Sequence, residues 1–151
     1  MNILLFSMPD SFEHTPTIAV RMPNGALTSL AGNVDPHHRV AAADLLLVQN
    51  RVRETVDRLV AEHEPDVVGF SVMTFQRKTA KGIIDLVRTR RPRARVVVGG
   101  YDPSLAPEVY TEDPDGGIDF IVRGEGEITF RELLRALETS GSAAKYPDFI
   151  G

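Results

Sequence analysis

Cysteine and tryptophan are both absent from this chain. Without cysteine, its own residues can form no disulfide, no thiolate zinc site and no iron–sulfur cluster, and they supply no thiol nucleophile. Any redox chemistry must therefore come from a bound cofactor or from another polypeptide.

Long apolar runs and a dominant sign of charge are lacking as well. No stretch approaches the ~20 apolar residues that a membrane span requires, and an apolar strand pattern begins at Ile3 with no signal-peptide pattern before it. The formal net charge is -4, with cations and anions mixed along the chain. A cluster of arginines at 88–95 is typical of a solvated helix end. We therefore predict a cytoplasmic protein with neither a nucleic-acid nor a membrane partner.

Short apolar runs alternate with amphipathic segments, as in an α/β domain with one core. Strands are predicted at 3–6, 39–48, 66–73, 95–100 and 118–122, the second with a helical alternative. Helices are predicted at 26–32, from Asn50 as N-cap to Pro65, at 80–87 and at 128–137. This alternation predicts a doubly wound, five-stranded parallel sheet of Rossmann or flavodoxin-like type, with strand order 2-1-3-4-5.

Three segments lie outside this pattern. Residues 10–38 are poor in apolar residues and punctuated by prolines, and so long a loop is commonly functional. Residues 101–113 predict a loop with a helical turn. Residues 140–151 have linker composition followed by a small apolar patch. We expect one domain at 1–139 and a linker at 140–151.

Two strand ends carry the strongest functional signal. The run 96–98 (VVV) leads into Gly99, Gly100 and Tyr101, and the run 120–123 (FIVR) leads into 124–127 (GEGE). Glycine lets the backbone approach a ligand with no Cβ in the way, and the carboxyl ends of parallel strands form the ligand crevice of such sheets. The two ends predict a site for a large, flat ligand that is contacted mostly by backbone.

The sequence does not match the motifs of three common families of proteins with this fold. A phosphoacceptor domain needs carboxylates after the first and third strands, where this chain has 7–9 (SMP) and 73–74 (MT). A flavodoxin needs a Ser/Thr/Gly phosphate loop after the first strand, which 8–12 (MPDSF) does not supply. A dinucleotide fingerprint needs three glycines there, whereas 124–129 offers two after the last strand, beside carboxylates that repel a pyrophosphate.

The segments 96–108 (VVVGGYDPSLAPE) and 119–134 (DFIVRGEGEITFRELL) resemble the N-terminal cobalamin-binding domain of cobalamin-dependent radical S-adenosylmethionine enzymes. That family has a double glycine after strand four, a later Pro-Glu, and Gly-Glu-Gly-Glu running into a helix. The resemblance covers nearly the whole chain. It implies a corrin ring over the carboxyl edge of the sheet, with the nucleotide tail of cobalamin inserted between strands.

The resemblance also implies which residues border the cofactor. They are Ser71, Val72, Met73 and Thr74 after strand three, Gly99, Gly100 and Tyr101 after strand four, and Gly124, Glu125, Gly126 and Glu127 after strand five. Structural alternatives remain open: Ser71 can cap a helix, the glycine pair can form a tight turn, and the two glutamates can be first-turn acids.

Two positions depart from the family. Cobalamin domains that bind cobalt through an imidazole carry Asp-x-His-x-x-Gly after strand one, whereas 10–16 (DSFEHTP) has neither that spacing nor the glycine. We therefore expect cobalamin to bind with its base displaced and with no histidine on cobalt, although His14 lies near that edge. His37 and His38 are expected on the surface at the opposite end of the sheet. Asp102 stands where the family often has histidine.

The sequence thus predicts the cobalamin-binding module of a radical S-adenosylmethionine enzyme, with methyl transfer as one possible reaction. The module has no catalytic residues and no metal ligands of its own. The iron–sulfur cluster and S-adenosylmethionine would belong to a C-terminal domain in cis, beyond the linker. The alternative is a flavodoxin-like regulatory or protein-interaction domain without a cofactor, with an apolar patch at Tyr146, Phe149 and Ile150.

Overall fold

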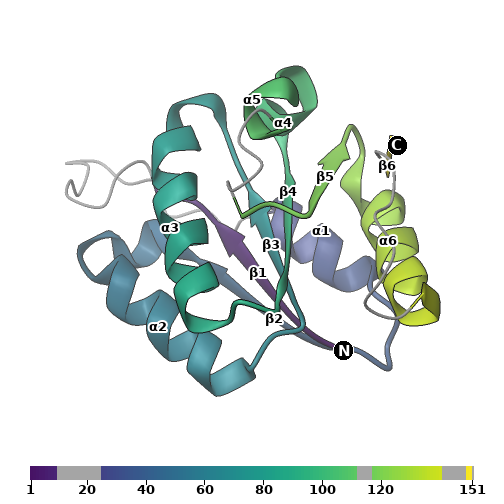
Figure 1. Cartoon of the computed structure of the whole chain (residues 1–151), viewed down its shortest axis with the longest axis horizontal. Coiled ribbons are helices and arrows are strands. Elements are labelled where there is room, and N and C mark those ends of the chain that lie inside the picture. The colour runs from purple at the N-terminus through teal and green to yellow at the C-terminus, as the bar shows by residue number, and fades with distance from the viewer. Residues whose placement is uncertain (10–24, 112–116, 141–148, 151) are drawn as a thin grey trace.

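The structure is a computed structural model, and it describes residues 1–9, 25–111, 117–140 and 149–150. A parallel sheet lies at its centre (Figure 1), with strand order β2-β1-β3-β4-β5-β6. Its strands are β1 (Asn2–Ser7), β2 (Arg39–Asp44), β3 (Val67–Ser71), β4 (Arg95–Gly99), β5 (Phe120–Arg123) and β6 (Phe149–Ile150). The predicted order 2-1-3-4-5 is confirmed. The two-residue strand β6, which the sequence analysis did not predict, pairs with β5 at the edge.

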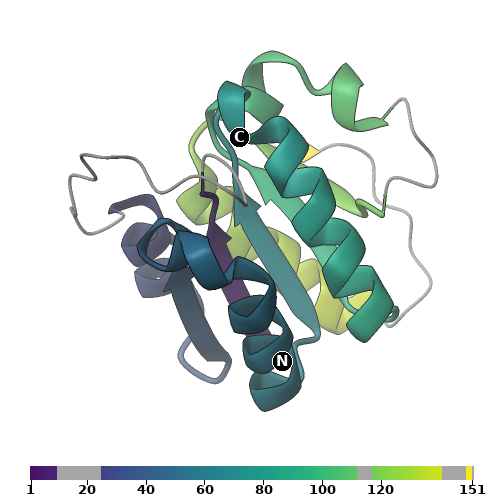
Figure 2. The same ribbon diagram turned by 90° about the vertical axis from the view of Figure 1, so that its left-hand side faces the viewer.

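Helices cover both faces of the sheet. The helices α2 (Val52–His63) and α3 (Arg77–Arg90) lie side by side on one face, as Figure 2 shows, and α1 (Gly25–Asn33) and α6 (Gly126–Ser140) pack together on the other. The doubly wound architecture is therefore confirmed. Among the described residues, no helix has the combination of length and hydropathy that crossing a bilayer requires.

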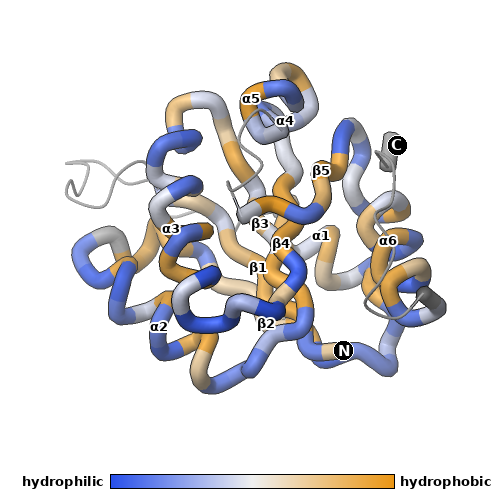
Figure 3. Tube along the Cα trace, viewed as in Figure 1, coloured by the Kyte–Doolittle hydropathy of each residue, from blue (hydrophilic) through white to orange (hydrophobic). Residues whose placement is uncertain are grey.

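The strands β1 to β5 contribute side chains to two separate cores, because successive side chains point to opposite faces of the sheet. In β1, Leu4 and Phe6 pack into the core under α2 and α3, whereas Ile3 and Leu5 pack into the core under α1 and α6. The ring of Phe6 meets that of Phe70 in β3 at a centroid distance of 5.8 Å. The central strands are accordingly among the most hydrophobic parts of the chain (Figure 3).

The second strand is shorter than predicted. It ends at Asp44, whose carboxylate accepts a hydrogen bond from the Leu46 N–H at 3.1 Å and starts the 3₁₀ helix η1 (Leu45–Arg51). The apolar run continues past Asp44, so hydropathy alone does not mark this boundary. The helix η1 leads directly into α2, and the predicted N-cap at Asn50 is therefore wrong, because Arg51 holds that position.

The other helix ends follow the predicted chemistry more closely. The helix α2 ends where Glu64 adopts a left-handed conformation (φ 43°) and donates its N–H to the Val60 carbonyl, directly before Pro65. The segment 101–113, predicted as a loop with a helical turn, contains two short helices in its described part, α4 (Tyr101–Leu105) and α5 (Glu108–Thr111). A 3₁₀ turn, η2 (Thr74–Gln76), precedes α3.

The arginine cluster is structural rather than simply solvated. Arg88 donates to the carbonyls of Gly117 and Ala94 and forms an ion pair with Asp119. Asp119 also pairs with Arg95 and accepts the Val96 N–H at 2.7 Å. These bonds fasten the end of α3 to the beginnings of β4 and β5, whereas Arg90 and Arg93 stay exposed, as predicted for a solvated helix end.

Candidate functional site

A cavity of about 190 Å³ opens at the carboxyl ends of β3, β4 and β5, on the face covered by α1 and α6. We call it the edge cavity. Strand residues Leu5 and Val97 and helix residues Leu27, Leu30 and Phe130 give it an apolar interior. Ser71 and the turns after β4 and β5 add polar groups. The edge cavity therefore combines an apolar interior with backbone and carboxylate groups, the composition expected for a small-molecule site.

Glycines hold this cavity open. A Cβ at Gly69 would lie 2.7 Å from Cδ2 of Leu5, and one at Gly99 would lie 3.3 Å from the Val122 carbonyl oxygen. At Gly100, φ is +101°, and a Cβ would lie 2.9 Å from the Val72 nitrogen. Larger residues at these positions would crowd the neighbouring strand or turn. The absent side chains therefore leave bare backbone on the strand faces that line the cavity.

The structure brings together seven of the residues that the sequence analysis singled out. Ser71 contributes from the end of β3, and the turns after β4 and β5 contribute the rest: Gly99, Gly100, Gly124, Glu125, Gly126 and Glu127. These residues come from three strands that are adjacent in the sheet. The parallel topology alone brings their carboxyl ends to one edge.

The other four predicted residues lie outside the edge cavity. Val72 is fully buried in the core under α2 and α3, and only its backbone joins the edge, through bonds to the Gly99 carbonyl and the Asp102 N–H. Met73 and Tyr101 are 44% and 59% exposed, and Thr74 is exposed beside them. These four residues line the carboxyl edge of the sheet rather than the cavity.

Several lining residues were missed by sequence reasoning. Gly69 interrupts an apolar strand, and a glycine within a strand is a known sign of close backbone approach that could have pointed to it. No comparable signal marks Ala26, Leu27 and Leu30, which α1 brings over the sheet against α6. The prediction of a helix at 26–32 is confirmed, but its position over the site depends on tertiary packing.

Ser104 links the two glycine turns. Its hydroxyl donates to the Gly100 carbonyl at 2.7 Å and accepts the Gly124 N–H at 3.0 Å. Gly124 has a φ of +72°, which favours glycine at this point of the β5–α6 turn. The relative position of the turns after β4 and β5 therefore depends in part on one hydroxyl group.

A carboxylate lies at the border of the cavity. The Ser29 hydroxyl donates to Oε1 of Glu127 at 2.7 Å, joining α1 to the first turn of α6. This hydrogen bond, followed by the residue's own backbone N–H, lowers the pKa of Glu127. Glu127 is consequently ionised at neutral pH and can accept hydrogen bonds from hydroxyl or amide groups.

A buried ion pair supports the turn after β4. Asp102 is 2% exposed; Arg77 donates to both of its carboxylate oxygens and the Tyr110 hydroxyl donates to one of them at 2.6 Å. The hydrogen bonds from Arg77 lower the pKa of Asp102 to about 2, and burial raises the pKa of Tyr110. Asp102, which departs from the family pattern, is thus a positioning residue for the turn at Gly100.

Gln76 performs a similar role for the turns after β1 and β3. Its amide donates to the Met8 carbonyl at 2.9 Å and its side-chain oxygen accepts the Met73 N–H at 3.0 Å. Gln76 is buried, so both bonds are shielded from water. Neither Gln76 nor Arg77 was predicted, because Met8 and Asp102, which they bind, lie 68 and 25 positions away in the sequence.

His37 and His38 lie at the opposite edge of the sheet. His37 is exposed as expected, but the expectation that His38 lies on the surface is wrong, because its side chain is buried beside Met1 and Glu138. Burial lowers the pKa of His38. His14 and Tyr146 lie outside the described residues, as do the side chains of Phe149 and Ile150.

Comparison with known proteins identifies the family. Residues 14–134 match the protein-family model of the B12 binding domain. The chain therefore belongs to the B12-binding domain family, and its doubly wound fold is the one expected of that family.

The individual relatives are longer proteins, among them a cyclase and a methyltransferase. The chain is 32% identical over 154 residues to the anaerobic magnesium-protoporphyrin IX monomethyl ester cyclase of Synechocystis, covering 96% of this chain and 29% of the relative. It is 34% identical over 84 residues to the cobalamin-dependent radical SAM methyltransferase TokK of Streptomyces tokunonensis, covering 55% of this chain and 12% of the relative. The chain thus spans less than a third of the length of either relative.

The structural comparison supports the same fold. The radical S-adenosylmethionine methyltransferase TsrM from Kitasatospora setae, solved with cobalamin and a [4Fe-4S] cluster, superposes with a TM-score of 0.72 at 24% identity. The match covers 91% of this chain and 26% of TsrM. The chain is therefore a B12-binding domain similar to those of cobalamin-dependent radical S-adenosylmethionine methyltransferases.

Proposed function

We propose that this chain is the cobalamin-binding domain of a radical S-adenosylmethionine enzyme and holds the nucleotide tail of cobalamin in the edge cavity. The observation that carries the proposal is the cavity itself, opened by Gly69 in the middle of β3 and by Gly99 at the end of β4. When bound, cobalamin supplies a cobalt centre that can carry a methyl group. The chain's own residues bind and orient the cofactor.

The size and lining of the edge cavity suit one arm of a larger ligand. Its volume of about 190 Å³ is below the roughly 300–1,000 Å³ of sites that enclose a whole small molecule. The apolar interior, with Phe130 and Leu30, suits the dimethylbenzimidazole ring. The carboxylates of Glu125 and Glu127 at the same cavity suit the ribose hydroxyls or the corrin amides.

Three exposed residues outside the edge cavity are suited to contact with the corrin ring. Met73, Thr74 and Tyr101 are exposed at the carboxyl edge, where a corrin would lie if its tail entered the cavity. Met73 and Tyr101 offer apolar contact, and Thr74 offers a hydroxyl. Val72 would contribute only through the backbone bonds that fix this edge.

A base buried in the cavity cannot also reach cobalt, so we propose that cobalamin binds with its base displaced. The motif Asp-x-His-x-x-Gly is absent after strand one, and His37 and His38 lie at the far end of α6. That helix has 15 residues and is therefore about 22 Å long. These histidines are too distant to ligate cobalt, which supports binding without a histidine ligand.

The domain would act together with a radical S-adenosylmethionine domain in cis. The chain contains no cysteine for an iron–sulfur cluster, and it spans 12–29% of the relatives described above. We infer one domain at 1–139 followed by a linker at 140–151 that adds the short strand β6 to the edge of the sheet, with the cluster and S-adenosylmethionine held by the partner domain.

Titration of hydroxocobalamin into the chain, followed by its visible spectrum, tests the proposal. We expect 1:1 binding with the spectral shift of a displaced base. A dissociation constant above about 1 mM, equivalent to only about -4 kcal/mol, would overturn it and favour a protein-interaction domain without a cofactor.

A further inference from the structure

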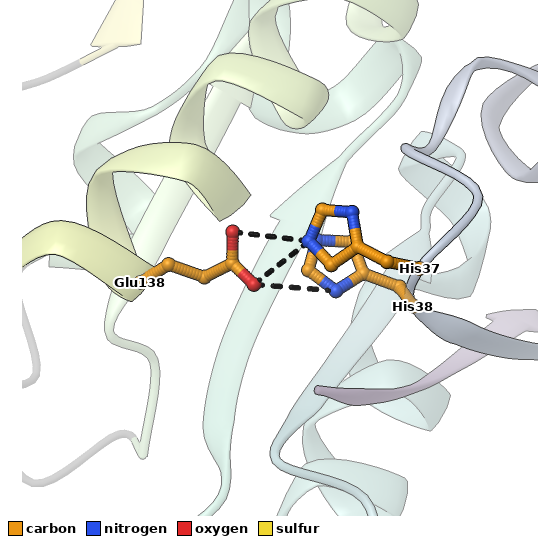
Figure 4. Close-up of side chains that lie close together, drawn as sticks. All are labelled: His37, His38 and Glu138. Atoms are coloured by element: carbon orange, nitrogen blue, oxygen red, sulfur yellow. Dashed lines mark hydrogen bonds and ion pairs between the residues drawn. The ribbon is translucent and has the colours of Figure 1, made fainter.

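A second cluster of ligating side chains lies at the opposite edge of the sheet from the edge cavity. His37 and His38 lie in the turn before β2, and Glu138 comes from the last turns of α6 (Figure 4). One ligand atom from each of the three lies within 4.8 Å of the other two. About 100 residues of sequence separate the histidines from the carboxylate, and the fold alone brings them together.

The distances between these atoms match those between ligands of one metal ion. Nε2 of His37 lies 3.0 Å from Oε1 of Glu138, and Nδ1 of His38 lies 3.6 Å from the same oxygen. In a tetrahedral zinc site with bonds of 2.0–2.1 Å, neighbouring ligand atoms lie about 3.3 Å apart. His37 is 58% exposed and Glu138 34%, so both side chains can make the small adjustment that a shared ion requires.

His38 is held in place but only partly satisfied. Its side chain is fully buried, its Nδ1 accepts a hydrogen bond from the Met1 amino group at 3.2 Å, and its Nε2 has no hydrogen-bond partner among the described residues. The nitrogen that faces Glu138 is Nδ1, so an ion shared with Glu138 would bind Nδ1 in place of the Met1 amino group and would not contact Nε2. The distance of 3.6 Å between Nδ1 of His38 and Oε1 of Glu138 is too long for a hydrogen bond.

We propose that His37, His38 and Glu138 form a binding site for a zinc-type divalent transition-metal ion. Two imidazoles and one carboxylate are a ligand set that zinc uses with a water molecule in the fourth position. The ion would join the turn before β2 to the end of α6. The ion pair between Arg135 and Asp35 already links the same two segments, with contacts of 2.7 and 2.9 Å. The site does not depend on cobalamin binding.

Zinc titration of the chain, prepared without a polyhistidine tag, tests the site by competition with a chromophoric chelator. We expect one ion per chain with a micromolar or lower dissociation constant. His37→Gln and Glu138→Gln should each weaken binding at least tenfold, whereas His63→Gln and Glu54→Gln, which change the same residue types on α2, should leave it unchanged. Equal affinities in all variants, or no binding below 1 mM, would overturn the proposal.

Two further measurements distinguish this site from adventitious surface binding. Cobalt(II) bound in the site should give the intense visible bands of tetrahedral coordination, and these bands should be lost in His37→Gln. Zinc should also raise the thermal unfolding midpoint of the unmodified chain and not that of Glu138→Gln. Because both substituted side chains are partly exposed, the variants are expected to fold, which far-ultraviolet circular dichroism checks. The same shift in both proteins would contradict the assignment.

Discussion

Arg77 and Asp102 form a bidentate ion pair in which Nε and Nη2 each lie 2.8 Å from a carboxylate oxygen. Asp102 follows the glycine pair at the end of β4 and is buried, whereas Arg77 begins α3 and is 37% exposed. The pair therefore links the turn after β4 to α3, which packs on the face of the sheet opposite the edge cavity.

Replacing Arg77 should lower the free energy of unfolding more than replacing Asp102. Arg77→Gln leaves a buried carboxylate without its cation and should cost about 3–5 kcal/mol of unfolding free energy. Asp102→Asn leaves an arginine that water can reach and should cost about 1–3 kcal/mol. Urea denaturation measures both values. The reverse order would mean that the carboxylate is better solvated than its burial indicates.

The same carboxylate makes stability depend on pH. The pKa of Asp102 is about 2 in the folded chain against an ordinary value of 3.8, so its contribution is fully present above about pH 4 and is lost as the pH falls toward 2. The shift corresponds to about 2 kcal/mol. Denaturation curves between pH 6 and 2 should show this loss in the unmodified chain and a smaller loss in Asp102→Asn. Parallel curves would contradict the assignment.

A side chain at Gly99 should block cofactor binding. Its Cβ would meet the Val122 carbonyl at 3.3 Å and would occupy the strand face that lines the edge cavity. We expect Gly99→Ala to weaken hydroxocobalamin binding at least tenfold and Gly99→Val to abolish it, with circular dichroism unchanged. Gly32→Ala in α1 is the matched control, because a Cβ there has nothing within 4 Å. Unchanged affinity in Gly99→Val would place the ligand elsewhere.

Ser104→Ala should loosen the two glycine turns. The substitution removes the hydroxyl that joins the Gly100 carbonyl to the Gly124 N–H, at a cost of about 0.5–1.5 kcal/mol. Amide hydrogen exchange at Gly124 should become faster, and cobalamin affinity should fall by a few-fold. Thr111→Ala, which removes a hydroxyl bonded to the Glu108 carbonyl, is the control. Exchange at Gly124 that does not change would show that the turn holds without this bond.

Cobalt should have no protein nitrogen ligand. Reduced cobalamin bound to the chain should therefore give an electron paramagnetic resonance spectrum without nitrogen superhyperfine splitting. His14→Gln should give the same spectrum, because no histidine motif follows β1. Nitrogen splitting that disappears in His14→Gln would identify that residue as a ligand after all.

The sequence predicted the sheet well because its signals are local. Apolar runs such as 96–98 and the amphipathic spacing of Val52, Val56 and Val60 depend only on near neighbours, and alternation of the two patterns implies parallel strands. Strand ends were less certain: Asp44 ends β2 through a single hydrogen bond inside a continuing apolar run. The hydrogen bond of the Asp44 carboxylate ends the strand there, although the residues that follow are apolar.

The candidate site likewise has one part that the sequence predicts and another that only the folded structure brings together. The sequence by itself determined the two glycine turns and the parallel topology that brings them to one edge, because apolar runs that stop at glycine and alternate with amphipathic helices are local patterns. Only the tertiary structure placed α1 over the cavity, paired Ser29 with Glu127, and gathered His37, His38 and Glu138 at the opposite edge. Those contacts join residues about 100 positions apart, and which surfaces meet at such separation depends on how the helices pack, which no local pattern specifies.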